Sequence, residues 1–315
     1  MSQVVEKIRL RVAEKTTLTP HVVGVRLVSE AGELPPAEPG AHVEVTLRNG
    51  ISRQYSVVPS PTRGDWCVAV LREADGRGGS AYIHDKLAVG DVVEATKPRS
   101  LFPLEEALEY LFLAGGIGIT PFLSMIEEAE RRERPWNLVY TGKSAETMAY
   151  ASALQSRYGE RVSIHETLGG TRIDCASVIS AHPRAEVYCC GPSSFIDGVK
   201  TATEAAKREV HVEHFHGEAH PHEGEQAFEL ELVDTGITLM VPADRTALDV
   251  VDDAGVFVPS SCREGTCGTC ETPVLSGEID HRDVVLSAKE KAQNSCMMLC
   301  VSRAAAGTSR VRIKL

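Results

Sequence analysis

The chain has 315 residues, 43% of them hydrophobic, and carries a formal net charge of −11. Its length predicts two or three domains, and its acidic balance argues against a nucleic-acid-binding protein. It has no apolar stretch of about 18 residues and no hydrophobic signal segment at its start, so we expect a cytoplasmic protein that does not associate with membranes. Nine scattered cysteines, an odd number, fit a reducing compartment better than a disulfide framework.

The first part of the chain is rich in short β-branched runs separated by turn residues such as Asn49-Gly50. Several strands at this spacing are typical of a small antiparallel β-barrel. One helix is predicted at about Ser80–Lys86. We assign residues 1–103 to this barrel domain, with strands expected at Ile8–Ala13, His21–Leu27, His42–Leu47, Gln54–Val58, Trp66–Leu71 and Val92–Ala95.

Strand-like and helix-like segments alternate from Glu109 onward, a pattern that predicts an α/β domain with a parallel sheet covered by helices. We assign residues 104–217 to this domain. Its expected strands are Tyr110–Ala114, Trp136–Thr141, Val162–Thr167 and Ala185–Cys189, and its expected helices are a segment ending at Arg132, Ala149–Tyr158 and Ser193–Ala206.

A polar run containing proline and glycine predicts an interdomain linker at residues 218–226. Its histidines, His220 and His222, also raise the alternative of a metal site, although their spacing alone is a weak signal. Residues 227–315 then begin with two predicted strands and a helix at Ala247–Ala254. This is the order of elements in an α+β ferredoxin of the β-grasp type.

Four cysteines of this last segment have the spacing C-x4-C-x2-C, with a fourth cysteine after a gap of 29 residues. Plant-type ferredoxins hold a [2Fe-2S] cluster with this arrangement of thiolates. The glycines between the cysteines allow the tight turns that such a loop needs. A structural zinc site would instead use a second closely spaced pair. We therefore predict that the cluster ligands are Cys262, Cys267, Cys270 and Cys300, and that Cys296 is not a ligand.

Two short motifs in the barrel segment predict a flavin site. In Arg53-Gln54-Tyr55-Ser56, an arginine can pair with a phosphate, a tyrosine can lie against a flat ring, and a serine can hydrogen bond near a ring nitrogen. In Gly76-Arg77-Gly78-Gly79-Ser80, glycines before a helix let the backbone approach a phosphate. A hairpin turn with Ser80 as a helix cap would explain the second motif by itself. Together the two motifs favour a flavin phosphate site.

Two motifs in the α/β segment point to a nucleotide. Gly115-Gly116-Ile117-Gly118-Ile119-Thr120 follows a strand and opens a helix, as a nucleotide-binding loop does. It lacks the G-x-G-x-x-G pattern, so a tight strand–helix turn is an alternative. Cys190-Gly191-Pro192 ends the last predicted strand, at the edge where parallel sheets bind ligands.

The order of these motifs makes the chain resemble the phthalate dioxygenase reductase and vanillate O-demethylase reductase family, within the ferredoxin–NADP reductase superfamily. The resemblance covers essentially the whole chain. It implies an NADH-dependent iron–sulfur flavoprotein that passes electrons from NADH through FMN and the [2Fe-2S] cluster to a terminal Rieske-type oxygenase. Such an oxygenase is an aromatic dioxygenase or an O-demethylase. The flavin would connect a two-electron donor to a one-electron acceptor.

The resemblance also implies which residues line the sites, and it assigns no catalytic acid or base. The flavin would be bound by Arg53, Tyr55, Ser56, Val70, Leu71, Arg72, Gly78, Gly79, Ser80, Thr120 and Phe215. Plain interdomain packing is the alternative for Phe215. The nicotinamide nucleotide would be bound by Gly116, Thr141, Lys143, Ser144, Asp174, Cys190 and Pro192. Lys143 and Ser144 could equally be exposed turn residues.

Cofactor preference and the electron acceptor follow from the same resemblance. Relatives with this domain order use FMN, whereas those with an N-terminal ferredoxin commonly use FAD. NADH is favoured over NADPH because only Lys143 is basic after the second strand of the sheet, and a 2′-phosphate pocket would favour an arginine. A quaternary-amine monooxygenase or a cytochrome P450 is an alternative acceptor, and a flavin-free redox sensor is a rival of another class. We expect a monomer.

Overall fold

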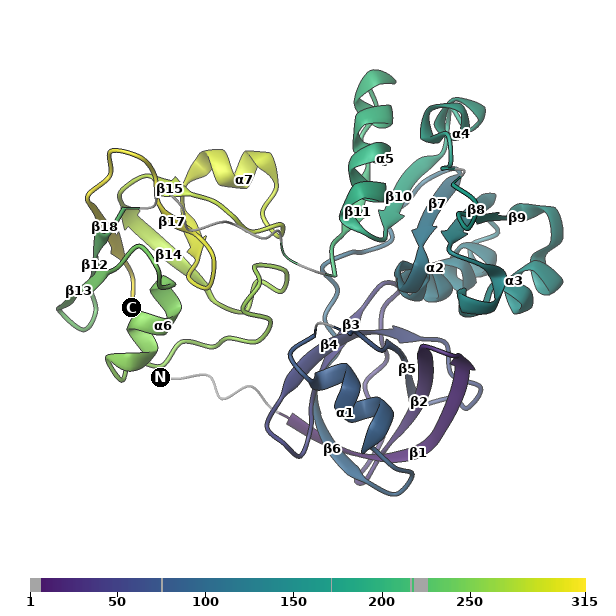
Figure 1. Cartoon of the computed structure of the whole chain (residues 1–315), viewed down its shortest axis with the longest axis horizontal. Coiled ribbons are helices and arrows are strands. Elements are labelled where there is room, and N and C mark those ends of the chain that lie inside the picture. The colour runs from purple at the N-terminus through teal and green to yellow at the C-terminus, as the bar shows by residue number, and fades with distance from the viewer. Residues whose placement is uncertain (1–6, 75, 171, 216, 218–225) are drawn as a thin grey trace. The chain divides into compact units, whose positions relative to one another are not determined.

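The structure is a computed structural model that describes residues 7–74, 76–170, 172–215, 217 and 226–315. The chain forms two compact units, Met1–Phe215 and His216–Leu315 (Figure 1). Each unit is described by itself. The multidomain organisation expected from the sequence is confirmed, whereas the boundary between residues 103 and 104 stays a prediction. The predicted linker at 218–226 lies outside the described residues, apart from Gln226.

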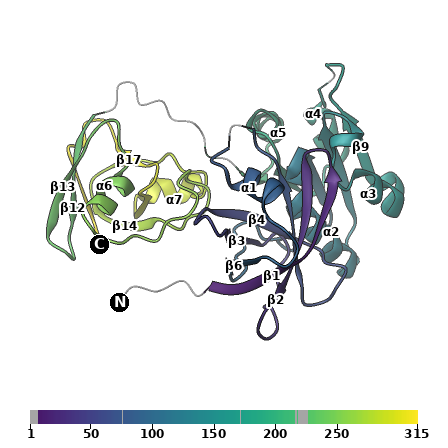
Figure 2. The ribbon, with the colours of Figure 1, turned by 60° about the horizontal axis from the view of Figure 1, so that its bottom comes forward.

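Six antiparallel strands of the first unit close into a barrel. The order around the barrel is β1-β2-β5-β4-β3-β6. Side chains alternate along β1, where Leu10 and Val12 are buried and their neighbours face outward; this period of two is what a half-buried strand requires. Figure 2 shows β1 and β2 side by side in the barrel wall. The elements are β1 (Lys7–Thr19), β2 (Val22–Ser29), β3 (His42–Thr46), β4 (Ser52–Val58), β5 (Trp66–Leu71), α1 (Gly79–Asp85) and β6 (Val92–Thr96).

The rest of the first unit is a parallel five-stranded sheet in the order β11-β10-β7-β8-β9. Its central strand β7 is buried at every position, because helices cover both faces and leave no polar side. The strands are β7 (Tyr110–Gly115), β8 (Trp136–Gly142), β9 (Val162–Glu166), β10 (Glu186–Cys190) and β11 (His211–Glu213). The helices are α2 (Thr120–Arg131), α3 (Ala151–Tyr158), α4 (Cys175–Ala181) and α5 (Ser193–Ala205), with short 3-10 turns at Gly116–Ile119, Ala145–Thr147 and Gly159–Arg161.

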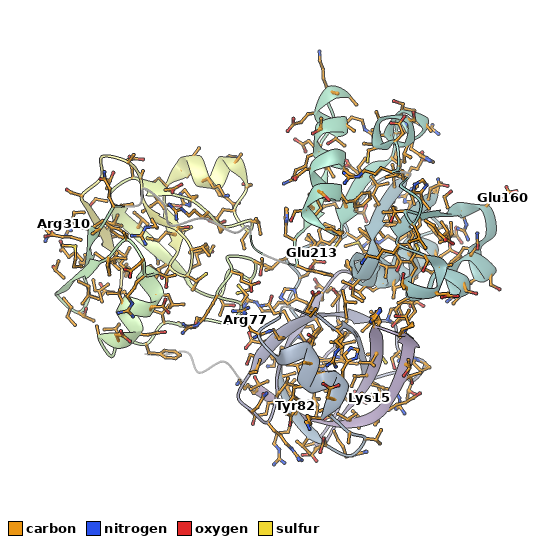
Figure 3. All side chains as sticks on the ribbon, viewed as in Figure 1. Lys15, Arg77, Tyr82, Glu160, Glu213 and Arg310 are labelled. Atoms are coloured by element: carbon orange, nitrogen blue, oxygen red, sulfur yellow. The ribbon has the colours of Figure 1, made fainter. Side chains whose placement is uncertain are left out.

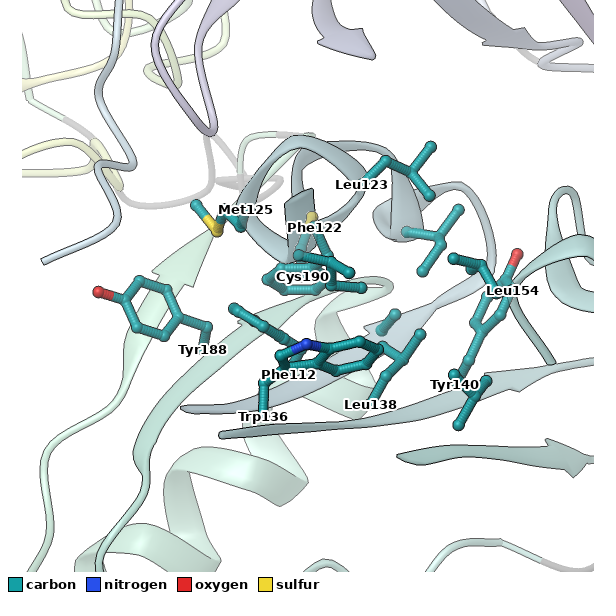
Figure 4. Packing of buried hydrophobic residues seen from close by; sticks show 14 of the residues in the cluster. Phe112, Phe122, Leu123, Met125, Trp136, Leu138, Tyr140, Leu154, Tyr188 and Cys190 are labelled. Carbon is teal, nitrogen blue, oxygen red and sulfur yellow. The ribbon is translucent and has the colours of Figure 1, made fainter. Parts of the chain in front are cut away.

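Each face of the sheet has its own hydrophobic core. Helices α2 and α3 cover an aromatic core that contains Phe112, Phe122, Trp136 and Tyr188 (Figure 4). Helices α4 and α5 cover a smaller aliphatic core on the opposite face. The aromatic core also includes Val58 from the barrel strand β4, so the barrel and the sheet share apolar surface. In the same region the amide of Gly40 donates a hydrogen bond to Ser124 Oγ on α2 at 3.0 Å.

The second unit is a mixed sheet in the order β13-β12-β18-β14-β16, with a separate two-stranded sheet β15-β17. Strands β12 and β18 are parallel, although they are the first and last strands of the unit. Helix α6 begins at the cap Thr246, whose hydroxyl accepts a hydrogen bond from the amide of Asp249 at 3.1 Å. The elements are β12 (Phe228–Leu232), β13 (Ile237–Val241), α6 (Ala247–Asp253), β14 (Glu271–Ser276), β15 (Ile279–Asp280), α7 (Ala288–Gln293), β16 (Cys296–Met298), β17 (Arg303–Ala304) and β18 (Arg310–Ile313).

Several bounds differ from the sequence-based expectations by one to several residues. The strand expected at Ile8–Ala13 continues to Thr19, and the helix expected from Ala149 begins at Ala151. Helix α4 and strand β11 were not expected from the sequence, because they are short and carry little apolar periodicity. None of the described helices is long and apolar enough to cross a membrane.

Candidate cofactor sites

Three of the four predicted cluster ligands lie in the loop between α6 and β14, and the fourth, Cys300, follows β16. Gly265 and Gly268 turn this loop with φ values of +71° and +68°. A Cβ atom at Gly265 would lie 2.7 Å from Val301 Cγ2 and 3.1 Å from Asp283 Cα. Glycine is therefore required at position 265 both by the backbone conformation and by the lack of space.

The four predicted ligands are brought together as neighbouring thiols. Hydrogen bonds from Cys267 and then Cys300 hold the pKa of Cys262 well below its usual range. A hydrogen bond from Cys300 likewise lowers the pKa of Cys270. The sulfurs thus form a connected series in the order Cys267, Cys262, Cys300 and Cys270. The same contacts raise the pKa values of Cys267 and Cys300, so the deprotonated form is favoured at Cys262 and Cys270. Thiolate is the form of cysteine that binds metal.

Backbone amides of the loop also point at these sulfurs. The amides of Glu264 and Thr266 donate to Cys262 Sγ at 3.3 Å and 3.4 Å, and that of Thr269 donates to Cys267 Sγ at 3.4 Å. N–H donors of this kind stabilise negative charge on sulfur and are a recognised means of tuning iron–sulfur centres. The loop therefore supplies ligands and charge compensation from one short segment.

Cys296 stands apart from this group. It lies on β16 opposite Pro273, and burial followed by the Glu271 carboxylate raises the pKa of its thiol. Among the described residues, no group of three or more His, Cys, Asp or Glu side chains is arranged to hold a single metal ion. A connected series of four thiols fits a cluster with two irons better than a single zinc ion, which needs its ligands around one point.

The predicted flavin motifs converge on one side of the barrel. Arg53 on β4 donates from Nη2 to the carbonyl of Arg77 at 3.3 Å, which brings its guanidinium to the glycine-rich loop before α1. A Cβ atom at Gly79 would lie 2.8 Å from Arg53 Cγ and 3.2 Å from Arg53 Nε. Gly78 has a φ of +82°. The structure thus places a fixed positive charge beside backbone that only glycine can form, an arrangement that suits a phosphate.

The remaining flavin candidates have mixed surroundings. Ser80 accepts a hydrogen bond from the amide of Glu73 at 3.1 Å, and Arg72 forms a two-point ion pair with Asp85 at 2.6 Å and 2.8 Å. Val70 is buried in the barrel core, with Leu71 beside it at the end of β5. Burial raises the pKa of Tyr55, so its hydroxyl stays neutral. The bond between Glu73 and Ser80 joins the glycine-rich loop to the end of β5, where Val70 and Arg72 already have structural partners.

Ser56 and Thr120 meet where the barrel borders the sheet. The Thr120 hydroxyl, at the start of α2, donates to Ser56 Oγ at 3.3 Å, and both residues are buried. Phe215 packs against the same aromatic core. Residues 56, 120 and 215 are far apart in sequence, so the fold, and no local motif, brings a barrel strand and the nucleotide loop together here.

The glycine-rich loop after β7 is fitted closely to the end of β10. A Cβ atom at Gly118 would overlap the Cys190 carbonyl and would lie 2.8 Å from the amide of Gly191. Gly116 has a φ of +56°, and Pro192 precedes α5 as its cap residue. Thr141 lies at the end of β8, beside Gly115, and its buried hydroxyl has no hydrogen-bond partner. Gly116, Thr141, Cys190 and Pro192 are therefore together at the carboxyl edge of the sheet, where parallel sheets bind ligands.

The other three nucleotide candidates have local roles. Lys143 is exposed, and Ser144 forms a capping box with Thr147. Asp174 caps α4, accepting from the amide of Ser177 at 3.1 Å and from its hydroxyl at 2.6 Å. Capping accounts for the Ser144 and Asp174 side chains without a nucleotide, so their assignment as nucleotide ligands stays a prediction.

Glu213 is a candidate that the sequence analysis did not single out. Glu213 ends β11 and is labelled in Figure 3. It pairs with Cys190 on β10, and its Oε2 atom is buried without a hydrogen-bond partner. Burial raises the pKa of Glu213 to about 8. Burial also raises the pKa of the Cys190 thiol, and Glu213 adds to that rise. A three-residue edge strand gave no periodicity to mark this carboxyl as buried, and its place two residues before Phe215 was the available signal.

We expect Glu213→Gln to change how stability depends on pH. The ordinary pKa of the Glu213 carboxyl is 4.5, and its pKa in the folded state is about 8. Between these two pH values the folded state keeps a proton that the unfolded state releases. The unfolding free energy of the wild type therefore falls as pH rises through this window, by up to about 1.4 kcal/mol per pH unit. The side chain introduced by Glu213→Gln does not titrate, so the variant does not show this fall. The unfolding free energy of the variant minus that of the wild type should therefore increase from pH 5.5 to pH 8.

Urea unfolding followed by tryptophan fluorescence measures this effect, because both tryptophans, Trp66 and Trp136, belong to the first unit. Glu209→Gln, at an exposed position of the same unit, is the control for loss of a carboxylate. Wild-type and Glu213→Gln curves that keep a constant separation across this pH range would show that Glu213 is ionised in the folded state.

The chain is similar in sequence and in structure to known proteins. A family model described as a 2Fe-2S iron-sulfur cluster binding domain matches residues 230–305, which include all four predicted cluster ligands. The vanillate O-demethylase oxidoreductase of Pseudomonas sp. (strain HR199 / DSM 7063) is 40% identical over 285 residues, which cover 88% of this chain and 90% of that protein. The solved structure of phthalate dioxygenase reductase, described as modular for electron transfer from pyridine nucleotides to [2Fe-2S], is 36% identical with a TM-score of 0.74, and each chain is covered to 98%.

This chain belongs to the phthalate dioxygenase reductase family. It is an iron–sulfur flavoprotein oxidoreductase with a flavin- and nucleotide-binding part and a ferredoxin domain. It is also similar to an intact type IV self-sufficient cytochrome P450 monooxygenase, with 34% identity and a TM-score of 0.87. That match covers all of this chain but only 42% of the other, so the chain spans about two-fifths of that longer protein.

Proposed function

We propose that this chain is the reductase component of a two-component oxygenase, carrying electrons from NADH through FMN to the [2Fe-2S] cluster and on to a Rieske-type terminal oxygenase. The observation that carries the proposal is that one chain combines the four clustered thiols with a barrel and a nucleotide loop that meet at Ser56 and Thr120. The bound flavin supplies the change from two-electron to one-electron transfer.

The residues of this chain bind and orient the cofactors. In the proposal Arg53 holds the flavin phosphate, Tyr55 lies against the ring, and Ser56 with Thr120 borders its polar edge. Gly116, Thr141, Cys190 and Pro192 line the nicotinamide path at the carboxyl edge of the sheet. Phe215 covers the flavin side of this path and excludes water. Cys262, Cys267, Cys270 and Cys300 ligate the cluster, and no side chain needs to act as a general acid or base.

FMN and NADH are the favoured cofactors within this proposal. Arg53 and the glycine loop would bind a terminal phosphate, so the ligand needs no further adenine pocket. Lys143, which is exposed, is the basic residue that directly follows β8. A single exposed lysine is a poor site for the 2′-phosphate of NADPH, so NADH is favoured. Nine cysteines, none of them in a disulfide, fit a reducing cytoplasm. We further propose that the chain works as a monomer and leaves the substrate specificity to its oxygenase.

A cytochrome P450 is the second candidate acceptor. It is favoured by the similarity, over the whole of this chain, to part of a self-sufficient P450 monooxygenase. The two acceptors use the same path from NADH to the cluster and differ only after it. Direct electron delivery to a purified Rieske oxygenase and to a purified P450 separates them.

Anaerobic titration of the full-length protein with NADH tests the proposal. We expect the visible bands of both flavin and cluster to bleach, and an EPR signal of a reduced [2Fe-2S] centre to grow. The protein should contain one flavin, two irons and two acid-labile sulfides per chain, as one cluster and one flavin require. Bleaching of the cluster by dithionite but not by NADH would contradict the proposed path.

A further inference from the structure

Two hydroxyl groups beside the cluster ligands are buried and have no hydrogen-bond partner. They are Ser261 Oγ and Thr269 Oγ1. Buried polar atoms in folded proteins nearly always have a partner, so each exception calls for an explanation. A hydroxyl hydrogen rotates freely about the C–O bond and can serve any acceptor that comes within reach.

The positions of these hydroxyls point to the acceptor. Ser261 directly precedes Cys262, and Thr269 directly precedes Cys270, so each flanks a predicted ligand in the loop. The amide of Thr269 donates to Cys267 Sγ at 3.4 Å, so Thr269 lies against one of the predicted ligands. Thr269 thus has one donor on a ligand sulfur and a second donor, its hydroxyl, that is buried without a partner.

We propose that Ser261 and Thr269 donate O–H···S hydrogen bonds to the sulfur atoms of the bound [2Fe-2S] centre. The inference rests on the proposed cluster assignment and goes beyond it, because these two residues are not ligands. Sulfides and thiolates of a cluster are anionic acceptors, and they are the acceptors that binding of the cluster adds to this loop. They would satisfy both donors at once.

Such hydrogen bonds set how readily the cluster accepts an electron. Reduction adds negative charge that spreads onto the sulfurs, so a donor hydrogen bond stabilises the reduced state more than the oxidised state. Hydrogen bonds to sulfur are one of the factors that fix the potential of iron–sulfur centres. Ser261 and Thr269 therefore raise the cluster potential and favour electron flow toward it.

Redox titration of the full-length holoprotein, followed by EPR, tests the inference. We expect Ser261→Ala and Thr269→Val each to lower the ratio of reduced to oxidised cluster at a fixed potential by about threefold to tenfold. Tenfold corresponds to about 59 mV for a one-electron couple. Resonance Raman spectra provide a second readout, because Fe–S stretching bands of the wild type should shift in D2O more than those of the variants.

Ser260→Ala and Thr235→Val are matched controls. Ser260 is the neighbour of Ser261, and its hydroxyl is not one of the buried hydroxyls that lack a hydrogen-bond partner. The Thr235 hydroxyl already donates to the Leu232 carbonyl. Ser261→Thr and Thr269→Ser keep the hydroxyl and should keep the wild-type potential. Potentials and D2O shifts of Ser261→Ala and Thr269→Val equal to those of the controls would overturn the inference.

Loss of the cluster from some of the variants would also test the inference. If Ser261→Ala and Thr269→Val lose it while the hydroxyl-retaining variants keep it, the hydroxyls are needed to hold the centre, which supports the inference. If the hydroxyl-retaining variants lose it as well, side-chain packing is responsible and the inference fails. A wild-type protein without any [2Fe-2S] EPR signal would instead contradict the proposed function.

Discussion

We expect Cys300→Ser to abolish the [2Fe-2S] centre and Cys296→Ser to keep it. Cys300 is the sulfur that joins Cys262 to Cys270, so its loss breaks the connected series of thiols and removes a predicted ligand. Cys296 lies on β16 opposite Pro273 and interacts with Glu271 instead, so it is not part of that series. Visible absorption, EPR and acid-labile sulfide measure the cluster directly.

The same pair of variants separates the two redox functions. Cys300→Ser should retain NADH-dependent reduction of ferricyanide, which takes electrons from flavin, and should lose reduction of cytochrome c. Cys296→Ser should retain both activities at wild-type level. A cluster that survives in Cys300→Ser and is lost in Cys296→Ser would reverse the ligand assignment.

Arg53→Ala should weaken flavin binding by about one to two orders of magnitude. A charge-assisted hydrogen bond to a phosphate contributes about 1.5–3 kcal/mol, and about 1.4 kcal/mol corresponds to tenfold in affinity. The structure holds the Arg53 side chain beside Gly79 and the Arg77 carbonyl, so little of that energy is spent on ordering it. Equilibrium dialysis of FMN against the apoprotein measures the change.

Arg53→Lys is the control for charge. It keeps the positive charge but loses the planar fork of the guanidinium, so we expect an affinity between those of the wild type and Arg53→Ala. Chromatography of the flavin released on denaturation identifies the species. Equal FMN affinity in all three proteins, or FAD as the sole released flavin, would contradict the phosphate-end assignment.

The cluster loop was predictable because its chemistry is local. Three predicted ligands and two turn glycines lie within nine residues, so spacing alone indicates the geometry. The strand at Trp66–Leu71 has the bounds that its β-branched run predicts. In each case neighbouring residues carry the whole signal.

The parts that the sequence did not predict depend on tertiary contacts. Helix α4 buries only Ile179 fully, and it is held by the Asp174 cap, so no apolar stripe marks it. Burial of Glu213 depends on its pairing with Cys190 on a strand from another part of the sequence. The meeting of Ser56 with Thr120 likewise joins residues 64 positions apart. Such contacts produce no periodic pattern of apolar residues in a single sequence.

The close fit of Gly118 against β10 determines where this protein can be re-engineered. Any side chain at that position would collide with the backbone of Cys190 and Gly191, and backbone cannot move aside without disturbing the sheet. A library aimed at switching the protein to NADPH therefore gains nothing from changes at position 118. Diversity placed at the exposed Lys143 meets no such barrier, so variants selected for the phosphorylated nucleotide should carry their changes there.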